Sequence, residues 1–235
     1  TYPSAQKPSI ENINLTVAAG ESIGVLGGTG SGKTTVVSLL PRLYDASEGR
    51  VTAFGHDVRE YSFAELRSLV AVAEQKSVLF AGSIRDNMLV GKPDATDAEI
   101  LTALERAQAL DFVLDHGGLE AYVEAGGKNL SGGQRQRLNV ARALVAMPKI
   151  LILDDSSSAL DFATDARLRH ALKLLREETG MTTVTVSQRA TTLSGCDQIM
   201  VLDEGEVVGL GKHDDLMASC EVYREIVRSQ DKEGK

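Results

Sequence analysis

The sequence lacks several features that would assign it to a common class of protein. It has only two cysteines among 235 residues, Cys196 and Cys220, and they form no pattern, so we expect buried thiols in a reducing cytosol. No apolar run approaches the ~20 residues that span a bilayer. The net charge of −8 argues against a surface that binds nucleic acid. Internal repeats and low-complexity segments are also missing, and the 43% hydrophobic residues are ample for a folded core.

The length and the local patterns predict an α/β protein. Strand and helix signals alternate along the chain, and 235 residues fit one large domain or a domain with an inserted lobe. From about residue 84 to residue 146 the pattern becomes helical, with apolar residues recurring at Ile100, Leu101, Leu104 and Ala107. This segment is a candidate for a helical lobe inserted into the sheet domain.

The most informative stretch is a glycine-rich run between an apolar strand and a helix. It consists of Gly27, Gly28, Thr29, Gly30, Ser31, Gly32, Lys33, Thr34 and Thr35, and fits the phosphate-binding pattern G-x-x-x-x-G-K-[ST]. The preceding run Ser22–Leu26 predicts a buried strand, and the following helix begins near Gly32. Glycines let successive N–H groups point at phosphate oxygens, and the helix N-terminus adds its positive dipole end. We therefore predict nucleotide binding, with Lys33 reaching the β- and γ-phosphates and the Thr34 hydroxyl holding Mg²⁺.

Two further runs place polar residues where a ligand could bind. The apolar residues 150–153 predict a buried strand with Asp154 and Asp155 at its carboxyl end, where α/β folds place ligands. The run Leu130-Ser131-Gly132-Gly133-Gln134 precedes a helix. Ser131 is the expected N-cap, and the apolar face of that helix comprises Leu138, Ala141 and Val145.

The remaining elements are predicted from shorter patterns. Alternation of Ile13, Leu15 and Val17 predicts a half-buried strand. Further strands are expected at residues 50–54, at 70–73 before Gln75, and at 182–187 before Gln188. The run 199–202, the turn Glu204-Gly205 and residues 207–208 predict a closing hairpin, followed by two short helices.

Taken together, these motifs resemble the ATP-binding cassette (ABC) ATPases over essentially the whole chain. The resemblance rests on the phosphate-binding loop, Gln75, residues 130–134, Asp154 and the run Ser158-Ala159-Leu160-Asp161. The L-S-G-G-Q run is the most specific of these, because other P-loop families lack it. The resemblance implies a P-loop NTPase core sheet with an antiparallel β subdomain, residues 1–83 and 147–235, and an inserted α-helical subdomain, about 84–146.

The resemblance also implies roles for individual residues. Tyr2 matches the aromatic that stacks on the adenine of ATP. Gln75 matches the Q-loop glutamine, an Mg²⁺ ligand and the hinge to the helical subdomain, and Asp154 matches the Walker B aspartate that holds Mg²⁺ through water. The set Ser131, Gly132, Gly133 and Gln134 would close on the γ-phosphate of ATP bound by an opposite chain. One complete site therefore needs two ABC domains, head to tail.

Residues 82–87 and 223–226 resemble the exporter branch of the family, in which the cassette is fused behind six membrane helices. The start at Thr1, followed by Tyr2-Pro3, is typical of the middle of a segment and predicts a piece of a longer protein. Residues 122–127 lie where exporters place the loop that contacts the coupling helices, although they depart from T-x-V-G-E-R-G, and Glu124 is the candidate contact. We expect the transmembrane domains as partners, at the cytoplasmic face of the cell membrane.

Two departures from the family pattern concern catalysis. Asp155 stands where the family has the glutamate that polarises the attacking water, and Gln188 stands at the position of the switch histidine. Aspartate lacks one methylene, which retracts its carboxylate by roughly 1 Å, a displacement that can cost ~10²-fold in rate. Gln188 can donate a hydrogen bond to the γ-phosphate but cannot pass on a proton. Both changes together resemble the degenerate half of a heterodimeric exporter, which implies low intrinsic ATPase activity for this chain. The simpler alternative is that the protein is a slow but working enzyme.

Two other functions are weighed against this hypothesis. One is a stand-alone ATPase subunit of an ABC importer with two functional sites, against which the exporter-like ending argues. The other is an ABC ATPase that acts on DNA or ribosomes, which the acidic balance and the absence of a coiled-coil insert disfavour. ATP, ADP and Mg²⁺ are expected ligands of any such domain, whereas the transported substrate is selected by membrane helices outside this sequence.

Overall fold

The computed structural model describes residues 1–2, 6–76, 78–156 and 159–233, so Pro3 and Ser158 of the predicted motifs lie outside the described residues. The chain divides into two compact units. The first comprises Thr1–Val70 and Thr182–Lys235, and the second comprises Ala71–Met181. The chain therefore leaves the first unit once and returns to it once.

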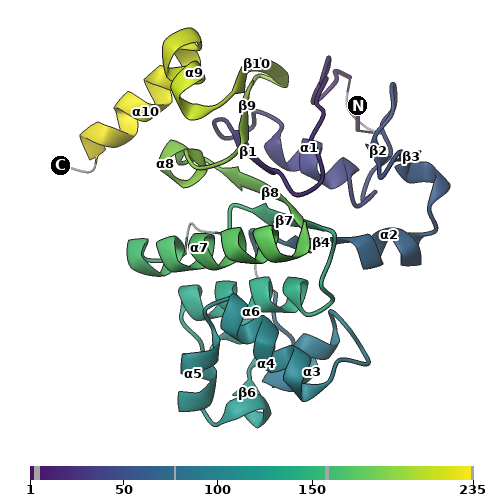
Figure 1. The fold of residues 1–235 in the computed structure, drawn as a ribbon, viewed down its shortest axis with the longest axis vertical. Helices are drawn as coiled ribbons and strands as arrows, with labels where there is room; N and C mark the ends of the chain where they lie inside the picture. Colours follow the sequence, from purple (N-terminus) through teal and green to yellow (C-terminus); the bar gives the residue numbers. More distant parts are fainter. Residues whose placement is uncertain (3–5, 77, 157–158, 234–235) are drawn as a thin grey trace. The chain divides into compact units, whose positions relative to one another are not determined.

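The first unit is built on a mixed sheet with the strand order β10-β9-β1-β8 (Figure 1). The strands are β1 Ser22–Leu26, β8 Thr182–Ser187, β9 Gln198–Asp203 and β10 Glu206–Gly211. Strand β1 pairs in parallel with both β8 and β9, whereas β10 pairs antiparallel with β9. All five residues of β1 are buried, as expected for a parallel strand with two neighbours. The strands predicted at 22–26 and 182–187 and the closing hairpin are confirmed.

Helices and one small sheet complete the first unit. They are α1 Lys33–Leu39, α2 Phe63–Leu69, α8 Ala190–Leu193, α9 His213–Ser219, α10 Glu221–Glu233, the strands β2 Thr52–Ala53 and β3 His56–Asp57, and a 3₁₀ turn at Val58–Glu60. Helices α8, α9 and α10 share an apolar cluster with the sheet, in which Leu26, Leu193, Leu216 and Tyr223 are buried. The last two helices follow β10 and carry the chain to its end (Figure 1).

Both cysteines belong to this cluster. Cys220 is buried, as predicted, but Cys196 is only half-buried at the edge of the cluster. Neither cysteine is part of a disulfide bond.

Two sequence predictions in the first unit need correction. The strand predicted from Ile13, Leu15 and Val17 is wrong, because residues 11–18, all of them described, form no strand. The alternation correctly marks the half-buried side chains, but an extended segment alternates whether or not a neighbour supplies ladder hydrogen bonds. The strand predicted at 50–54 contracts to Thr52–Ala53, because Phe54 and Gly55 have positive φ and turn the chain into a two-residue hairpin.

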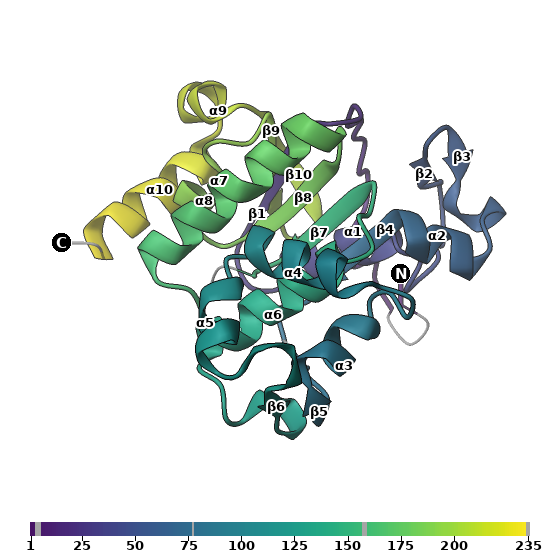
Figure 2. The same ribbon diagram turned by 60° about the horizontal axis from the view of Figure 1, so that its bottom comes forward.

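The second unit combines two neighbouring strands with a group of helices (Figure 2). The strands are β4 Val70–Ala73 and β7 Ile150–Asp154, with a small antiparallel pair of β5 Gly82–Ser83 and β6 Tyr122–Val123. The helices are α3 Ile84–Leu89, α4 Asp97–Arg106, α5 Leu110–Asp115, α6 Gly132–Leu144 and α7 Phe162–Thr179, with 3₁₀ turns at Gly118–Glu120 and Ala125–Gly127. The predicted strands at 70–73 and 150–153 are confirmed.

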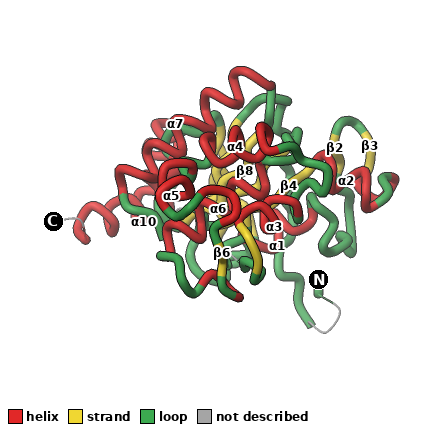
Figure 3. The backbone as a smooth tube through the Cα atoms, turned by 90° about the horizontal axis from the view of Figure 1, so that it is seen from below, coloured by secondary structure: helices red, strands yellow, loops and turns green. Residues whose placement is uncertain are grey.

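Helix α4 is central to the core of the second unit, because it contacts α5, α6 and α7. Its buried residues Ile100 and Leu104 belong to one apolar cluster with Leu138 and Leu144 of α6. Figure 3 shows α3, α4, α5 and α6 gathered together, with the short β6 beside them. The predicted apolar face of α6 is buried at Leu138, Ala141 and Val145. The subdomain boundaries proposed at about 84 and 146 remain a prediction.

Within the described part of the chain, none of the helices combines the length and the apolarity that crossing a bilayer requires.

Candidate functional site

In the first unit, the carboxyl ends of three strands bring polar segments to one edge of the sheet. Leu26 of β1 pairs with Ser187 of β8 and with Val201 of β9. Because these pairings are parallel, the glycine-rich loop and Gln188 begin beside each other, directly after their strands. This is the edge at which α/β folds bind ligands.

The glycine-rich loop has little room for side chains at two of its positions. A Cβ on Gly27 would lie 2.4 Å from the Leu202 carbonyl oxygen and 2.4 Å from the Ser31 Oγ. Gly32 is the N-cap of α1 with φ of 98°, and a Cβ there would lie 2.5 Å from the Ile10 Cγ2. Only glycine suits such positions, so the loop is drawn tightly against β9 and the N-terminal segment.

Lys33 reaches back into the loop that precedes it. Its ammonium donates hydrogen bonds to the Gly27 carbonyl oxygen at 2.8 Å and to the Gly28 carbonyl oxygen at 2.6 Å. The residue is only 9% exposed, and a buried charge needs such partners to offset its desolvation. The two carbonyl oxygens therefore hold the Lys33 ammonium in the loop, where the motif requires a positive charge to bind phosphate.

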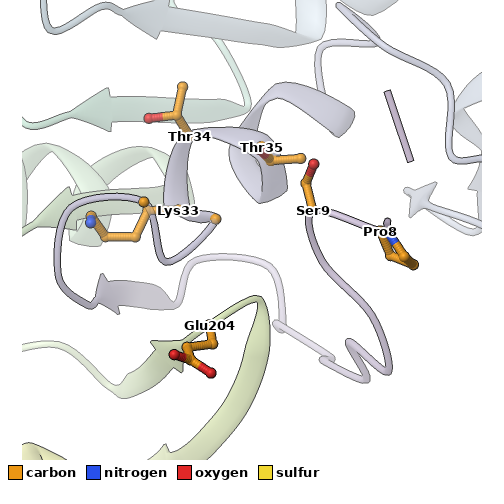
Figure 4. A pocket seen from close by; sticks show the side chains of 8 residues that line it. Pro8, Ser9, Lys33, Thr34, Thr35 and Glu204 are labelled. Atoms are coloured by element: carbon orange, nitrogen blue, oxygen red, sulfur yellow. The ribbon is translucent and has the colours of Figure 1, made fainter. Parts of the chain in front are cut away.

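A pocket of about 440 Å³ opens beside this loop (Figure 4). It is lined by Pro8, Ser9, Gly30, Gly32, Lys33, Thr34, Thr35 and Glu204. The exposed Thr34 and half-buried Thr35 come from the first turn of α1, whose N–H groups have no partners within the helix. Thr29, also predicted to contact the ligand, is exposed in the loop and does not line the pocket. The pocket thus offers hydroxyls, backbone N–H groups and a lysine, which suit a phosphate.

Pro8, Ser9 and Glu204 are pocket residues that the sequence analysis missed. Glu204 lies in the hairpin turn after β9, with φ of 46°. It directly follows the strand β9, as Asp155 directly follows β7, and that position was the signal that could have identified it. The turn is fixed in place, because the Glu11 N–H donates to the Gly205 carbonyl oxygen at 3.0 Å.

Tyr2 is connected to the pocket through Thr35. The Tyr2 hydroxyl and the Thr35 Oγ1 share a hydrogen bond at 3.1 Å. The Tyr2 ring makes an edge contact with Tyr44, with centroids 4.9 Å apart and an angle of 83° between the planes. Tyr44, which is 48% exposed, was not predicted to take part in the site. The aromatic ring predicted to stack on a base is therefore held next to the phosphate-binding helix.

In the second unit, the structure brings Gln75 and Asp155 together. The Gln75 Nε2 donates to the Asp155 Oδ2 at 3.1 Å across 80 positions of sequence. The two residues follow the neighbouring strands β4 and β7. Asp154, the last residue of β7, is 9% exposed and so lies deeper than Asp155. The predicted metal ligands Gln75 and Asp154 thus belong to the same unit.

Asp155 has an unusual backbone conformation. Its φ of 47° lies in the left-handed region, which few residues other than glycine adopt and which aspartate tolerates better than most. A strained backbone at the end of a core strand is typical of functional sites. The hydrogen bond from Gln75 occupies one carboxylate oxygen of Asp155.

The predicted N-cap of α6 is confirmed. The Ser131 Oγ accepts from the Gln134 N–H at 3.2 Å, and the Gln134 Oε1 accepts from the Ser131 N–H at 2.9 Å, which is a capping box. Ser131 is exposed, whereas Gly132, Gly133 and Gln134 are half-buried. A Cβ on Gly132 would lie at an ordinary 3.6 Å from the Ala159 Cβ, whereas a Cβ on Gly133 would lie at a tighter 3.3 Å from the Ala159 carbonyl oxygen.

The loop before α6 and the start of α7 are also fixed by polar contacts. Arg135 donates to the Leu130 carbonyl oxygen at 2.8 Å. Asp161 caps α7, and hydrogen bonds from the Thr164 N–H and hydroxyl lower the pKa of Asp161 below its usual value. Glu124 is exposed beside α6, and its N–H donates to the Asn129 Oδ1 at 3.0 Å, so its predicted contact role remains a prediction.

Mg²⁺ prefers oxygen ligands and usually keeps waters and substrate phosphates in its shell. The described residues contain no cluster of three or more His, Cys, Asp or Glu side chains suited to a metal. The predicted ligands instead supply a hydroxyl from Thr34, an amide oxygen from Gln75 and a carboxylate from Asp154. The amide nitrogen of Gln75 is hydrogen-bonded to Asp155, so the Gln75 Oε1 is the atom of this amide that would coordinate a metal. Oxygen donors of this kind fit Mg²⁺ in each unit taken by itself, with a hydroxyl in the first unit and an amide oxygen and a carboxylate in the second.

Comparisons with known proteins agree with these observations. The family described as ABC transporter matches residues 10–158. An uncharacterized ABC transporter ATP-binding protein of Mycobacterium tuberculosis is 42% identical over 98% of this chain and 40% of its own length. The Rhodopseudomonas palustris β-(1→2)glucan export ATP-binding/permease protein NdvA is 43% identical over 96% of this chain and 37% of its own length.

A solved structure gives the same result for the fold. A bacterial Atm1-family ABC exporter with ATP bound superposes with a TM-score of 0.90 at 33% identity, covering 94% of this chain and 39% of that chain. The chain thus spans about 40% of the length of the curated relatives that it matches.

Proposed function

The chain belongs to the ABC transporter family, and from this premise we propose that it is the ATP-binding domain of an exporter, contributing the degenerate site of a heterodimer. By a degenerate site we mean one that binds ATP but hydrolyses it slowly. The domain would act at the cytoplasmic face of the membrane, joined to transmembrane domains and paired with a second ABC domain. The relatives and the solved structure named as exporters support the exporter assignment.

The observation that carries ATP binding is the strand–loop–helix around Lys33. The loop already holds the Lys33 ammonium on its carbonyl oxygens, and a nucleotide would offer that ammonium phosphate oxygens instead. Thr34 and Thr35, in the first turn of α1, line the same pocket, and a helix N-terminus offers its N–H groups to a phosphate. Mg²⁺, when bound with the nucleotide, would neutralise phosphate charge, and the family resemblance implies Thr34, Gln75 and Asp154 as its ligands.

The observations that support a degenerate site concern Asp155 and Gln188. The short Asp155 carboxylate is engaged by the Gln75 amide, so it is poorly suited to take a proton from an attacking water. Gln188 directly follows β8, and the phosphate-binding loop directly follows the neighbouring strand β1. Its amide can donate a hydrogen bond to a terminal phosphate but carries no titratable proton. The site can therefore bind and orient ATP while lacking an effective base.

The test is to restore the two side chains that the family normally has. We expect the full-length protein to bind MgATP but to turn over below ~1 s⁻¹ without its partner. The double variant Asp155→Glu, Gln188→His should raise phosphate release by about tenfold to a hundredfold, because it restores the reach of the carboxylate and a titratable imidazole. The matched control is Asp155→Gln, Gln188→His, which restores length without a carboxylate. Fast turnover of the unmodified protein would contradict the degenerate assignment.

A separate prediction concerns Tyr2. Tyr2→Ala should weaken ATP binding by about 1 kcal/mol, on the scale of aromatic pair energies, because it removes the ring. Tyr2→Phe and Tyr2→Trp keep a ring against Tyr44 and lose only the hydroxyl link to Thr35, so we expect them to be nearly neutral. Isothermal titration calorimetry with ATP measures all three. An equal loss in the three variants would show that the ring is not the platform for adenine.

A further inference from the structure

The last helix of the chain reaches the turn that follows β8. Gln230 of α10 places both ends of its side-chain amide on this turn: the Oε1 accepts from the Ala190 N–H at 2.9 Å, and the Nε2 donates to the Gln188 carbonyl oxygen at 2.7 Å. We call residues 187–190 the switch turn. Gln230 thus brackets Arg189 with two hydrogen bonds, from 42 positions downstream of Gln188.

The contacts of Gln230 satisfy backbone groups that local structure leaves unpaired. Ala190 is the first residue of α8, so its N–H has no acceptor within that helix. No side-chain cap is present on α8 either, because Arg189 occupies the N-cap. At the other end of the switch turn, the buried Ser187 accepts from the Arg189 N–H at 2.9 Å through its Oγ. The switch turn is therefore held by local hydrogen bonds, such as the one from the Thr192 N–H to the Arg189 carbonyl oxygen, and by the distant Gln230.

Helix α10 is itself fixed to the body of the first unit. Tyr223 is fully buried in the apolar cluster and its hydroxyl lies 2.7 Å from the His213 Nδ1. Ile226 and Val227, close to Gln230 along the helix, pack against the same cluster as Leu193 of α8. An amide carried by such a helix can hold the switch turn, because its own backbone is held by packing.

We propose that Gln230 is a positioning residue, which orients Gln188 toward the terminal phosphate of ATP by holding the backbone on either side of Arg189. The inference rests on the proposed function in one respect, the assignment of Gln188 to the γ-phosphate. Because Leu26 pairs with Ser187 in parallel, the phosphate-binding loop and Gln188 begin at the same level of the sheet. A tilt of the peptide between Gln188 and Arg189, whose carbonyl oxygen accepts from Gln230, therefore changes where the Gln188 side chain is directed.

The proposal predicts a specific loss, because ADP lacks the phosphate that Gln188 would contact. Gln230→Leu keeps the approximate size of the side chain but removes both hydrogen bonds. We expect ATP affinity of the full-length protein to fall by about threefold to tenfold, the effect of one or two neutral hydrogen bonds, with ADP affinity unchanged. Ser229→Ala is the control on the same helix, since Ser229 only bonds the Ile226 carbonyl oxygen.

A double-mutant cycle separates positioning from general stability. If Gln230 acts through Gln188, adding Gln230→Leu to Gln188→Ala should cause no further loss of ATP affinity. Amide hydrogen exchange of residues 188–193 should also rise in Gln230→Leu without any nucleotide. Additive losses, or equal losses for ATP and ADP, would overturn the proposal.

The same cycle distinguishes the two assignments. If Gln188→Ala lowers the ratio of ATP to ADP affinity and Gln230→Leu does not, only the role of Gln230 is wrong. If Gln188→Ala leaves that ratio unchanged, the role of Gln188 in the proposed function fails, and the inference about Gln230 fails with it.

Discussion

Lys33→Met should abolish ATP binding at millimolar concentrations of nucleotide. The ammonium is the buried cation of the loop, and truncating a buried, hydrogen-bonded charge costs about 2–5 kcal/mol. Affinity should therefore fall by about thirtyfold to a few thousandfold. Methionine has a similar unbranched stem, so the loop should lose the contacts to the Gly27 and Gly28 carbonyl oxygens without a clash. Equilibrium titration with MgATP is the measurement.

The control for this prediction is Lys212→Met, which removes the same charge from an exposed position in the first unit. It should leave ATP affinity within about twofold, because an exposed charge outside the site is screened. Thermal unfolding of both variants shows whether the fold is retained. If Lys33→Met binds ATP as tightly as Lys212→Met, the pocket beside the glycine-rich loop is not the nucleotide site.

Gly132→Glu should reduce the ATPase activity of the assembled heterodimer by on the order of 10³-fold. We place the start of α6 against the γ-phosphate bound by the partner domain, where a carboxylate would add both bulk and a negative charge. The measurement is steady-state ATPase activity of the reconstituted heterodimer. Since the partner's site is the one with the expected catalytic glutamate, its loss should remove nearly all turnover.

Two substitutions at Gly132 separate the effect of charge from that of folding. Gly132→Ala places its Cβ 3.6 Å from the Ala159 Cβ and 3.9 Å from the Arg135 Nη2, which are ordinary contacts, so α6 should form normally. Gly132→Gln has nearly the size of glutamate without its charge. We expect the loss to increase from alanine to glutamine to glutamate. Equal losses in glutamine and glutamate would remove the electrostatic part of the argument.

Asp155→Asn is the contrasting variant, and most turnover of the heterodimer should survive it. Asparagine adopts positive φ at least as readily as aspartate, and its amide oxygen can still accept from Gln75. The change therefore removes only a carboxylate that we consider too short to activate water. If Asp155→Asn abolishes activity as completely as Gly132→Glu, the site on this chain is catalytic, and its assignment as degenerate is wrong.

Elements that depend on local sequence were predicted well. The Ser131 N-cap and the Glu204-Gly205 turn are each determined by residues within a few positions of one another, and the strands at 22–26 and 182–187 were each indicated by a short run of residues. Capping, burial of an apolar run and positive φ in a two-residue turn are short-range effects, so their signals survive in the sequence alone. The family resemblance likewise rests on short motifs.

The failed strand at 13–17 illustrates the limit of such signals. Ile13, Leu15 and Val17 are half-buried in alternation, as the pattern predicted. A strand also requires a neighbour at hydrogen-bonding distance, and the pattern contains no information about that neighbour. The shortened strand at Thr52–Ala53 has the same cause, since its length is set by the hairpin partner.

What the sequence by itself determined is the family, the phosphate-binding loop and the identity of the residues that depart from the family pattern. Only the tertiary structure decided which of them meet: Gln75 with Asp155 across 80 positions, Tyr2 with Thr35 across 33, and Gln230 with Gln188 across 42. Each contact joins ordinary polar residues, which could pair with many others. Strand order and helix packing determine which of these residues pair, because they bring distant segments within hydrogen-bonding range.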